Sequence, residues 1–289
     1  MKACLSLLSA VAASCAAAGV FLPLVDEVFD PNECIWNGRQ VDPSEKPVEA
    51  PKNMTLFLLA GQSNMAGRAP VPEADLQPLE RTYKLNRDGK WVPATSPLHF
   101  DRAAAGMGPA NSFAKAYLAA HPDETIGLVP CAVGGSGMAT WIDGGEGMHG
   151  CNLRNALGRA RIAAANGRFA AILWHQGECD ATRADGTREK CVAVYSRRFR
   201  DMVARIRDEL GEPDLPVIVG EIGRFWSARR KADELINPVL NALPDTVTHC
   251  ACVSSIDLTP ISDGLHFDYP STDTLGRRYY AAYESLTAK

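Results

Sequence analysis

The stretch LFLLAGQSNMAGR, residues 56–68, decides the fold. Five apolar residues lead into a small polar turn that carries a single serine, Ser63. An uninterrupted apolar run of this length is typical of a strand that is buried on both faces of a parallel sheet. A serine that directly follows such a strand is either a catalytic nucleophile or the N-cap of the next helix. The rest of the sequence has to decide between these two interpretations.

Similar apolar runs recur along the chain and alternate with helical patterns. We expect strands at residues 55–61, 126–135, 170–178, 216–223 and 247–258. Amphipathic or small-residue patterns predict helices at 112–121, 153–167, 187–211, 227–243 and 274–286, with Pro238 bending or ending its helix. Strands that alternate with helices predict an α/β fold, a three-layer α/β/α sandwich around a central parallel sheet.

The composition is that of a globular protein. The chain has 289 residues, 46% hydrophobic and 22% charged, with a formal net charge of −4. Because no basic excess is available to neutralise phosphates, we expect no nucleic-acid partner. The sequence gives no indication of the oligomeric state.

The N-terminal region predicts export. A lysine, an apolar run and small residues make residues 1–18 a signal peptide and the protein secreted or periplasmic. The alternatives are a short buried helix, or a lipoprotein signal with Cys15 as the lipidated residue. Residues 19–53 are rich in proline and acid and predict an irregular strap, and residues 54–289 predict one catalytic domain. No later run is long enough to predict a transmembrane segment.

Export changes the interpretation of the cysteines, because oxidising compartments favour disulfides. Seven cysteines follow the signal, which predicts three bridges and one free thiol: they are Cys34, Cys131, Cys151, Cys179, Cys191, Cys250 and Cys252. Cys131 lies in an apolar run and is the expected free thiol, and Cys179 with Cys191 is the easiest pair to join. The rival interpretation is a zinc site at His249, Cys250 and Cys252, whose spacing differs from that of structural zinc sites, so no metal is expected.

The residues that follow the expected strands have the chemistry of ester hydrolysis. In an open parallel sheet the carboxyl ends of the strands form one edge, where ligands bind. A serine attacks an ester only if a base takes its proton, and His266 is suited to that role. Asp263, three residues earlier, is close enough in sequence to orient the imidazole. His175 is the competing base, but the strand alternation directs it away from the face that Gln176 uses.

Hydrolysis also requires donors for the oxyanion of the tetrahedral intermediate. The Ser63 N–H, the N–H of Gly134 or Gly135 and the Gln176 side-chain amide are the candidates. The pattern G-x-S-x-G is absent, since Ser63 is followed by Asn64 and Met65. This argues against the α/β-hydrolase fold.

The blocks GQSNM, IGLVPCAVGGSG, WHQGE and DGLHFD, with GPANSFAKAYL and ATWIDG, resemble those of SGNH-type hydrolases. The similarity is to the branch of sialate O-acetylesterases and acetylxylan esterases, and it extends from about residue 54 to the last helix. The resemblance implies a flavodoxin-like three-layer fold and no metal or cofactor. It also implies Ser63 as nucleophile, Asp263 and His266 as the rest of a triad, and Gly134 with Gln176 in the oxyanion hole.

We therefore expect a secreted serine esterase that removes O-acetyl groups from carbohydrate, of the acetylxylan or sialic acid type, through an acetyl-enzyme. Asn64, Trp141 and Glu178 are candidate substrate-binding residues. Trp141 offers a stacking face for a sugar ring unless it packs in the core, and Glu178 either binds a substrate hydroxyl or caps a loop. The alternatives are a lipid or thioester hydrolase on the same fold, and a sugar-binding protein without turnover.

Overall fold

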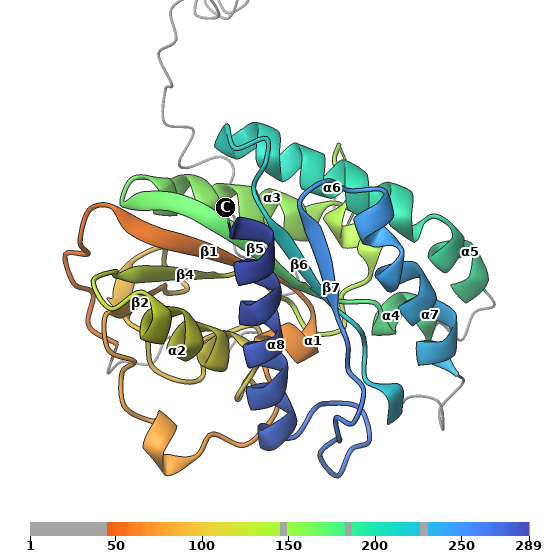
Figure 1. Ribbon diagram of the computed structural model, residues 1–289, viewed down its shortest axis with the longest axis horizontal. Coiled ribbons are helices and arrows are strands. Elements are labelled where there is room, and N and C mark those ends of the chain that lie inside the picture. The colour runs from red at the N-terminus through yellow and green to blue at the C-terminus, as the bar shows by residue number, and fades with distance from the viewer. Residues whose placement is uncertain (1–44, 145–148, 183–186, 226–230, 289) are drawn as a thin grey trace, which may run out of the picture.

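A computed structural model describes residues 45–144, 149–182, 187–225 and 231–288. These residues form a seven-stranded sheet with helices packed on both faces (Figure 1). The strands are β1 (Met54–Gly61), β2 (Thr82–Leu85), β3 (Trp91–Pro93), β4 (Ile126–Pro130), β5 (Gly167–His175), β6 (Val217–Gly220) and β7 (Cys250–Val253).

The strand order is β3-β2-β4-β1-β5-β6-β7. All neighbours pair in parallel except β2 and β3, which pair antiparallel at one edge. Strand β1 lies at the centre between β4 and β5, so it has no free edge and both of its faces are covered. This position explains the uninterrupted apolar sequence at residues 56–60. The predicted three-layer sandwich with a central parallel sheet is confirmed.

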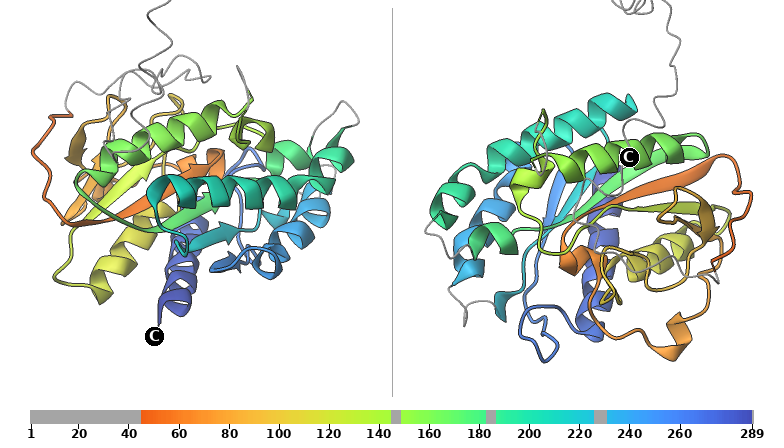
Figure 2. Two further views of the ribbon diagram at one scale, coloured as in Figure 1. Left: turned by 90° about the horizontal axis from the view of Figure 1, so that it is seen from above. Right: turned by 180° about the vertical axis from the view of Figure 1, so that it is seen from behind.

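Two helical layers cover the sheet. The longer helices are α2 (Ala110–Ala120), α3 (Cys151–Ala164), α6 (Tyr195–Leu210), α7 (Ala232–Asn241) and α8 (Tyr269–Thr287). Helices α3 and α6 pack on one face, and α2 and α8 pack on the other (Figures 1 and 2). Alternate residues of β1 contribute to the two cores: Leu56 and Leu58 join one apolar cluster, and Phe57 and Leu59 join the other. Because successive side chains of a strand point to opposite faces, this one short sequence contributes to the apolar cores on both sides of the sheet.

Short elements connect the longer ones and contribute to the site. They are α1 (Ser63–Ala66), α4 (Glu178–Ala181), α5 (Arg188–Ala193), η1 (Glu73–Asp75), η2 (Met138–Trp141) and η4 (Leu243–Asp245).

Several predicted elements differ from those observed. The helix expected at 187–211 is two helices, α5 and α6, because Val194 between them has φ −102° and ψ −2°, outside regular helix geometry. Helix α7 contains Pro238 and continues to Asn241, so of the two expectations for this proline the one that it ends the helix is wrong. The antiparallel pair of β2 and β3 was not predicted, and the strands expected at 126–135 and 247–258 are shorter than expected.

The segment before β1 is described from residue 45 and has no regular secondary structure there. Its Val48 N–H donates a hydrogen bond of 2.9 Å to the carbonyl of Trp91, which fastens the segment to β3 at the sheet edge. The predicted signal peptide at 1–18, Cys15 and Cys34 lie outside the described residues. Among the described helices, none combines the length and the apolar composition that a membrane span requires.

The six described cysteines downstream of the strap are all free thiols: Cys131, Cys151, Cys179, Cys191, Cys250 and Cys252. The prediction of bridges among them, including Cys179 with Cys191, is therefore wrong. Cys131, Cys151 and Cys250 are buried in the core, where a thiol packs as a small apolar group. Burial raises the pKa of Cys131 to about 11, consistent with an unreactive core thiol.

Candidate active site

The carboxyl ends of β1, β4 and β5 bring the predicted blocks together at one edge of the sheet. Helix α1 follows β1, and α4 follows β5. The glycine loop, residues 134–137, comes after β4, while the loop that precedes α8 approaches from β7 (Figure 1). Between them lies a cleft of about 350 Å³. Its lining residues are Gln62, Ser63, Arg68, Arg102, Gly134, Gly135, Glu178, Cys179, Thr182, Leu265 and His266.

Ser63 is the first residue of α1, directly after the end of β1. The turn requires glycine at position 61, where φ is +125° and a Cβ would lie 2.1 Å from the carbonyl oxygen of His175. This tight turn places Ser63, which is 7% exposed, at the floor of the cleft. The local geometry explains why a glycine and a serine follow the apolar run.

Ser63, His266 and Asp263 form a continuous hydrogen-bonded chain. The Nε2 of His266 lies 2.9 Å from the Oγ of Ser63, and its Nδ1 lies 2.6 Å from the Oδ2 of Asp263. The other oxygen of Asp263 accepts the backbone N–H groups of Leu265 and His266 at 2.7 and 3.0 Å. These contacts fix the carboxylate and the ring in one orientation.

The electrostatics keep Asp263 ionised. Partial burial alone would raise the pKa of Asp263, but the hydrogen bonds from the His266 ring and from the His266 and Leu265 backbone outweigh it and hold the pKa below its ordinary value. An ionised carboxylate accepts the Nδ1 proton of His266. The Nε2 lone pair is then free to accept the proton of Ser63, as general-base catalysis requires.

His175 cannot serve as the base in this arrangement. Its side chain is fully buried, and this burial lowers its pKa to about 3. The hydroxyl of Tyr279 donates to the Trp174 carbonyl at 2.6 Å, so its oxygen accepts the Nδ1 proton of His175 at 3.2 Å. His175 is therefore a neutral core residue beneath the site, as the strand alternation predicted.

The glycine loop resolves which of the two glycines can donate to an oxyanion. The N–H of Gly134 is already bound to the Oδ2 of Asp101 at 2.8 Å. The N–H of Gly135 has no partner among the described residues, and Gly135 has a left-handed φ of +78° in the wall of the cleft. The N–H of Ser63 is likewise unpaired within the described chain. Two backbone donors thus belong to residues that line the cleft with the Ser63 hydroxyl.

Gln176 is not among the residues that line the cleft. Its side chain is fully buried, with its Nε2 at 2.7 Å from Asp180 Oδ2 and 3.2 Å from the Ser136 carbonyl, and its Oε1 accepting from Tyr195. The predicted direct donation from Gln176 to an oxyanion has no geometric support, because both amide protons already have acceptors. Gln176 instead packs behind Gln62, whose Oε1 lies 3.3 Å from its Nε2.

Gln62 is a site residue that the sequence analysis missed. It lines the cleft, and its Oε1 also accepts the N–H of Cys179 at 3.3 Å. The N–H of Cys179 identifies this atom as the amide oxygen, so Nε2 is the donor of the Gln62 side chain. This Nε2 bonds no described residue and is not enclosed in the core, so it is open to the cleft. Its position directly before Ser63 in the GQSNM block was the available signal.

The predicted substrate-binding residues have different positions. Trp141 is fully buried, its ring centroid lies 5.0 Å from that of Trp174, and the two rings pack edge to face. The predicted sugar-stacking face at Trp141 is therefore wrong, because the ring belongs to the core. Asn64 is 3% exposed, bonds Glu178 and the N–H of Phe267, and is not among the described residues that line the cleft. Glu178 is 2% exposed and contributes to the cleft.

Two arginines in the cleft wall were also not predicted. Arg68 pairs with the buried Asp101 at 2.6 Å, and Asp101 in turn holds the N–H of Gly134. Arg102 donates from Nη2 to the carbonyl of Gly134 at 2.8 Å. Within the described chain Arg102 has no carboxylate partner, so its charge is available in the cleft.

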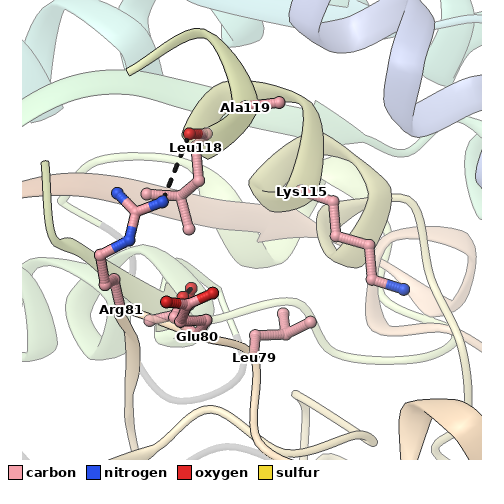
Figure 3. Close-up of a pocket in the computed structure, with 7 residues that line it drawn as sticks. Leu79, Glu80, Arg81, Lys115, Leu118 and Ala119 are labelled. Carbon is pink, nitrogen blue, oxygen red and sulfur yellow. Dashed lines mark hydrogen bonds between the residues drawn. The ribbon is translucent and has the colours of Figure 1, made fainter. Parts of the chain in front are cut away.

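A second cavity of about 230 Å³ lies between α2 and residues 79–82 (Figure 3). Its Arg81 donates to the carbonyl groups at the end of α2, including those of Leu118 and Pro122. Its Lys115 is ion-paired with Asp75. These charged groups stabilise a helix end and a loop. Across the described residues, no group of three or more His, Cys, Asp or Glu side chains is arranged to hold a metal ion.

Several solved proteins share the fold of this chain. The structure is similar to that of an Arabidopsis thaliana protein, with 27% identity, a TM-score of 0.70 and coverage of 81% of this chain and 99% of that one. It shares its fold with NanS, at 20% identity, a TM-score of 0.64 and coverage of 82% and 98%. A carbohydrate acetylesterase from Xanthomonas citri has the same fold, at 19% identity, a TM-score of 0.59 and coverage of 80% and 56%.

The family follows from the sequence. Residues 53–285 match the family model described as carbohydrate esterase, sialic acid-specific acetylesterase. The chain therefore belongs to this carbohydrate esterase family. The same Arabidopsis thaliana protein whose structure is similar is named as a probable carbohydrate esterase, and it is 28% identical over 276 residues, which cover 86% of this chain and 98% of that protein.

Proposed function

We propose that the protein is a serine esterase that removes O-acetyl groups from carbohydrates through an acetyl-enzyme. The observation that carries the proposal is the chain of contacts from Ser63 Oγ to His266 Nε2 at 2.9 Å and from His266 Nδ1 to Asp263 at 2.6 Å. Membership of the carbohydrate esterase family supports the substrate class. The proposal extends this family activity to a particular mechanism and particular residues.

In the first half-reaction, His266 Nε2 takes the proton of Ser63 as Oγ attacks the acetyl carbonyl carbon. The negative charge that forms on the carbonyl oxygen is stabilised by the N–H groups of Ser63 and Gly135 and by the Gln62 amide. When the tetrahedral intermediate collapses, the bond to the sugar oxygen breaks. That oxygen takes the proton from His266, and the deacetylated sugar leaves.

In the second half-reaction, water donates a proton to His266 Nε2 and attacks the acetyl group on Ser63. Collapse of this intermediate releases acetate and returns the proton to the Ser63 oxygen. Asp263 stays ionised throughout and stabilises the imidazolium, consistent with its lowered pKa. No step uses a metal or a cofactor.

Within the acetylated carbohydrates, the charge of the cleft favours an acidic sugar. Arg68 is neutralised by Asp101, whereas Arg102 keeps an uncompensated charge beside the glycine loop. A guanidinium in a cleft is suited to a substrate carboxylate. We therefore rank O-acetylated acidic sugars such as sialic acid above neutral acetylxylan. The predicted signal at 1–18 supports action outside the cytoplasm, as a secreted or periplasmic enzyme.

The test is release of acetate from O-acetylated sialic acid, acetylated xylan and acetylated pectin by the purified protein. We expect steady multiple-turnover release from at least one of them by the wild type, and a loss of several orders of magnitude in Ser63→Ala. Binding without acetate release would instead favour a non-catalytic sugar-binding protein. Release that persists in Ser63→Ala would exclude the serine mechanism.

A further inference from the structure

Asn64 connects the nucleophile to the histidine loop. It directly follows Ser63 in α1, and its side chain is buried. Its Oδ1 accepts the backbone N–H of Phe267 at 3.2 Å, and its Nδ2 lies 3.4 Å from the carbonyl oxygen of Leu265. The amide therefore holds the chain on both sides of His266. One turn of helix thus carries the nucleophile and also holds the loop that carries the base.

Glu178, which lies just after the end of β5, holds the amide of Asn64 in place. Its Oε1 accepts from the Nδ2 of Asn64 at 2.6 Å, and the carboxyl is 2% exposed in α4, just after β5. The two protons of Nδ2 are directed at Glu178 and at the Leu265 carbonyl. These contacts determine the orientation of the Asn64 amide. If its oxygen and nitrogen were exchanged, the oxygen would face the two acceptors and the nitrogen would face the N–H of Phe267.

The groups behind Glu178 do not compete for Asn64. His175 Nε2 carries no proton, because its Nδ1 proton is held by Tyr279, and it lies 3.8 Å from Oε1 of Glu178. Asp180, the nearest other carboxylate along α4, accepts from Gln176 and from the Met138 N–H. Burial raises the pKa of Glu178, opposed by its bond to Asn64. Asn64 is therefore the side chain to which Glu178 is bonded in the described chain.

We propose that Asn64 and Glu178 form a positioning pair that holds the His266 loop in register with Ser63, without contact to the reacting atoms. The pair joins the ends of β1 and β5 to the loop before α8. This proposal rests on the proposed serine mechanism. It also revises the expectation that these two residues bind substrate, since a positioning role affects turnover whereas a substrate contact affects KM.

The first test compares Asn64→Ala with the wild type in kcat and KM for acetate release. We expect kcat to fall by about 10- to 100-fold, because small displacements of a catalytic group are costly, and KM to stay within about 2-fold. The matched control is Asn237→Ala. Asn237 is also buried and also bonds an N–H and a carbonyl, those of Ile222, outside the cleft. The control should lower the melting temperature and leave kcat near that of the wild type.

The second test uses Glu178. Glu178→Gln retains an acceptor for Asn64 and should keep kcat within about 3-fold of the wild type, whereas Glu178→Ala should match Asn64→Ala. Because the two residues act as a unit, the double alanine variant should lose little more than either single variant. The glutamate variants also test the pair if Asn64→Ala does not fold.

A spectroscopic readout separates positioning from general destabilisation. The proton shared by His266 Nδ1 and Asp263 is expected as a downfield resonance in the NMR spectrum of the wild type. It should broaden or shift in Asn64→Ala and remain unchanged in Asn237→Ala. An unchanged kcat in folded Asn64→Ala, or a rise in KM alone, would overturn the proposal. Failure of the serine mechanism would appear separately, as acetate release by Ser63→Ala.

Discussion

The Nε2 of His266 lies 2.9 Å from the Oγ of Ser63, although the two residues are 203 positions apart in the chain. The contact joins the end of the central strand β1 to the loop that precedes the last helix, α8. Because Ser63 and His266 are far apart in the sequence, the fold of the chain between them determines the distance between their side chains. The candidate active site is therefore a product of the tertiary fold.

Replacement of either residue should abolish turnover. Ser63→Ala and His266→Ala should each lower kcat by several orders of magnitude, and the double variant should be hardly worse, because the two side chains act as a unit. Asp263→Asn should do less harm, since the ring keeps part of its orientation. Steady-state acetate release checks these values. The assignment of the base is wrong if His266→Ala stays active while His175→Ala does not.

The oxyanion donors can be separated by comparing two glutamines. Gln62→Ala should lower kcat by about 10- to 100-fold with little change in KM, because it removes a donor that acts mainly on the transition state. Gln176→Ala removes a buried donor to the Ser136 carbonyl and one of the two donors to Asp180 Oδ2, so it should destabilise the fold by about 1–3 kcal/mol. Kinetics and thermal melts of both variants provide the measurement. A loss of kcat without a loss of stability in Gln176→Ala would restore it as the direct donor.

Two buried histidines should make the fold sensitive to acid. Burial lowers the pKa of His99 to about 4 and that of His175 to about 3, from an ordinary value of 6.5. As the pH falls below 6.5, the unfolded chain binds protons at these positions and the folded chain does not, so the free energy of unfolding decreases. The loss should continue until each folded-state pKa is reached, with a slope of about 1.4 kcal/mol per pH unit for each histidine.

Urea unfolding between pH 7.5 and 4.5 checks this expectation. In His99→Asn and in His175→Gln, the slope of the unfolding free energy against pH should be smaller than in the wild type by the contribution of about one proton. Glu178, whose pKa burial raises, acts in the opposite direction above pH 4.5, and its contribution cancels when His99→Asn and the wild type are compared. Equal slopes in the wild type and the two variants would contradict the assignment.

Strand ends were predictable because buried parallel strands have a simple sequence signature. The apolar run of β1 and the blocks at Gly134 and His266 identified the edge of the sheet at which the site lies. The hairpin of β2 and β3 was missed although Asp88 and Gly89 lie at its turn, a recognisable signal for such a connection. Short edge strands have too few residues to show a clear alternation.

Other site residues could not be found from local sequence. Arg68, Asp101 and Arg102 come from loops without a periodic pattern, and tertiary contacts bring them to the glycine loop. Gln176 follows the end of a strand as expected, but its partners Asp180 and Tyr195 determine where the amide points. The prediction that Trp141 stacks on a sugar was wrong for a related reason, since nothing in the sequence near Trp141 shows that Trp174 packs against it.

The proposed preference for acidic sugars rests on Arg102. Arg102→Gln should lower kcat/KM on O-acetylated sialic acid by about 10-fold or more, since a hydrogen bond to a charged group contributes roughly 1.5–3 kcal/mol. On neutral acetylated xylan the loss should be within about 3-fold. Arg200→Gln, an exposed arginine on α6, is the control. Equal losses on both substrates would assign Arg102 to support of the Gly134 loop through its carbonyl.

The size of the acyl group is the last property that the cleft predicts. A hydrolase of long-chain lipids requires a continuous apolar surface for the acyl tail, because each methylene contributes about 0.8 kcal/mol when it is buried. Among the described residues that line this cleft, Leu265 is the one large aliphatic side chain, and the walls carry Arg68, Arg102, Glu178 and backbone of the glycine loop. Longer chains would therefore meet charged or polar groups.

We accordingly expect kcat/KM on aryl esters to be highest for acetate, to fall steeply at butyrate and to be undetectable at octanoate. The measurement is a chain-length series on one preparation, with Ser63→Ala as the blank for non-enzymatic hydrolysis. Aryl esters share one leaving group, so differences along the series report the acyl site alone. A maximum at octanoate or longer would contradict the carbohydrate deacetylase proposal and favour a lipid hydrolase on the same fold, because the cleft would then have to open an apolar path.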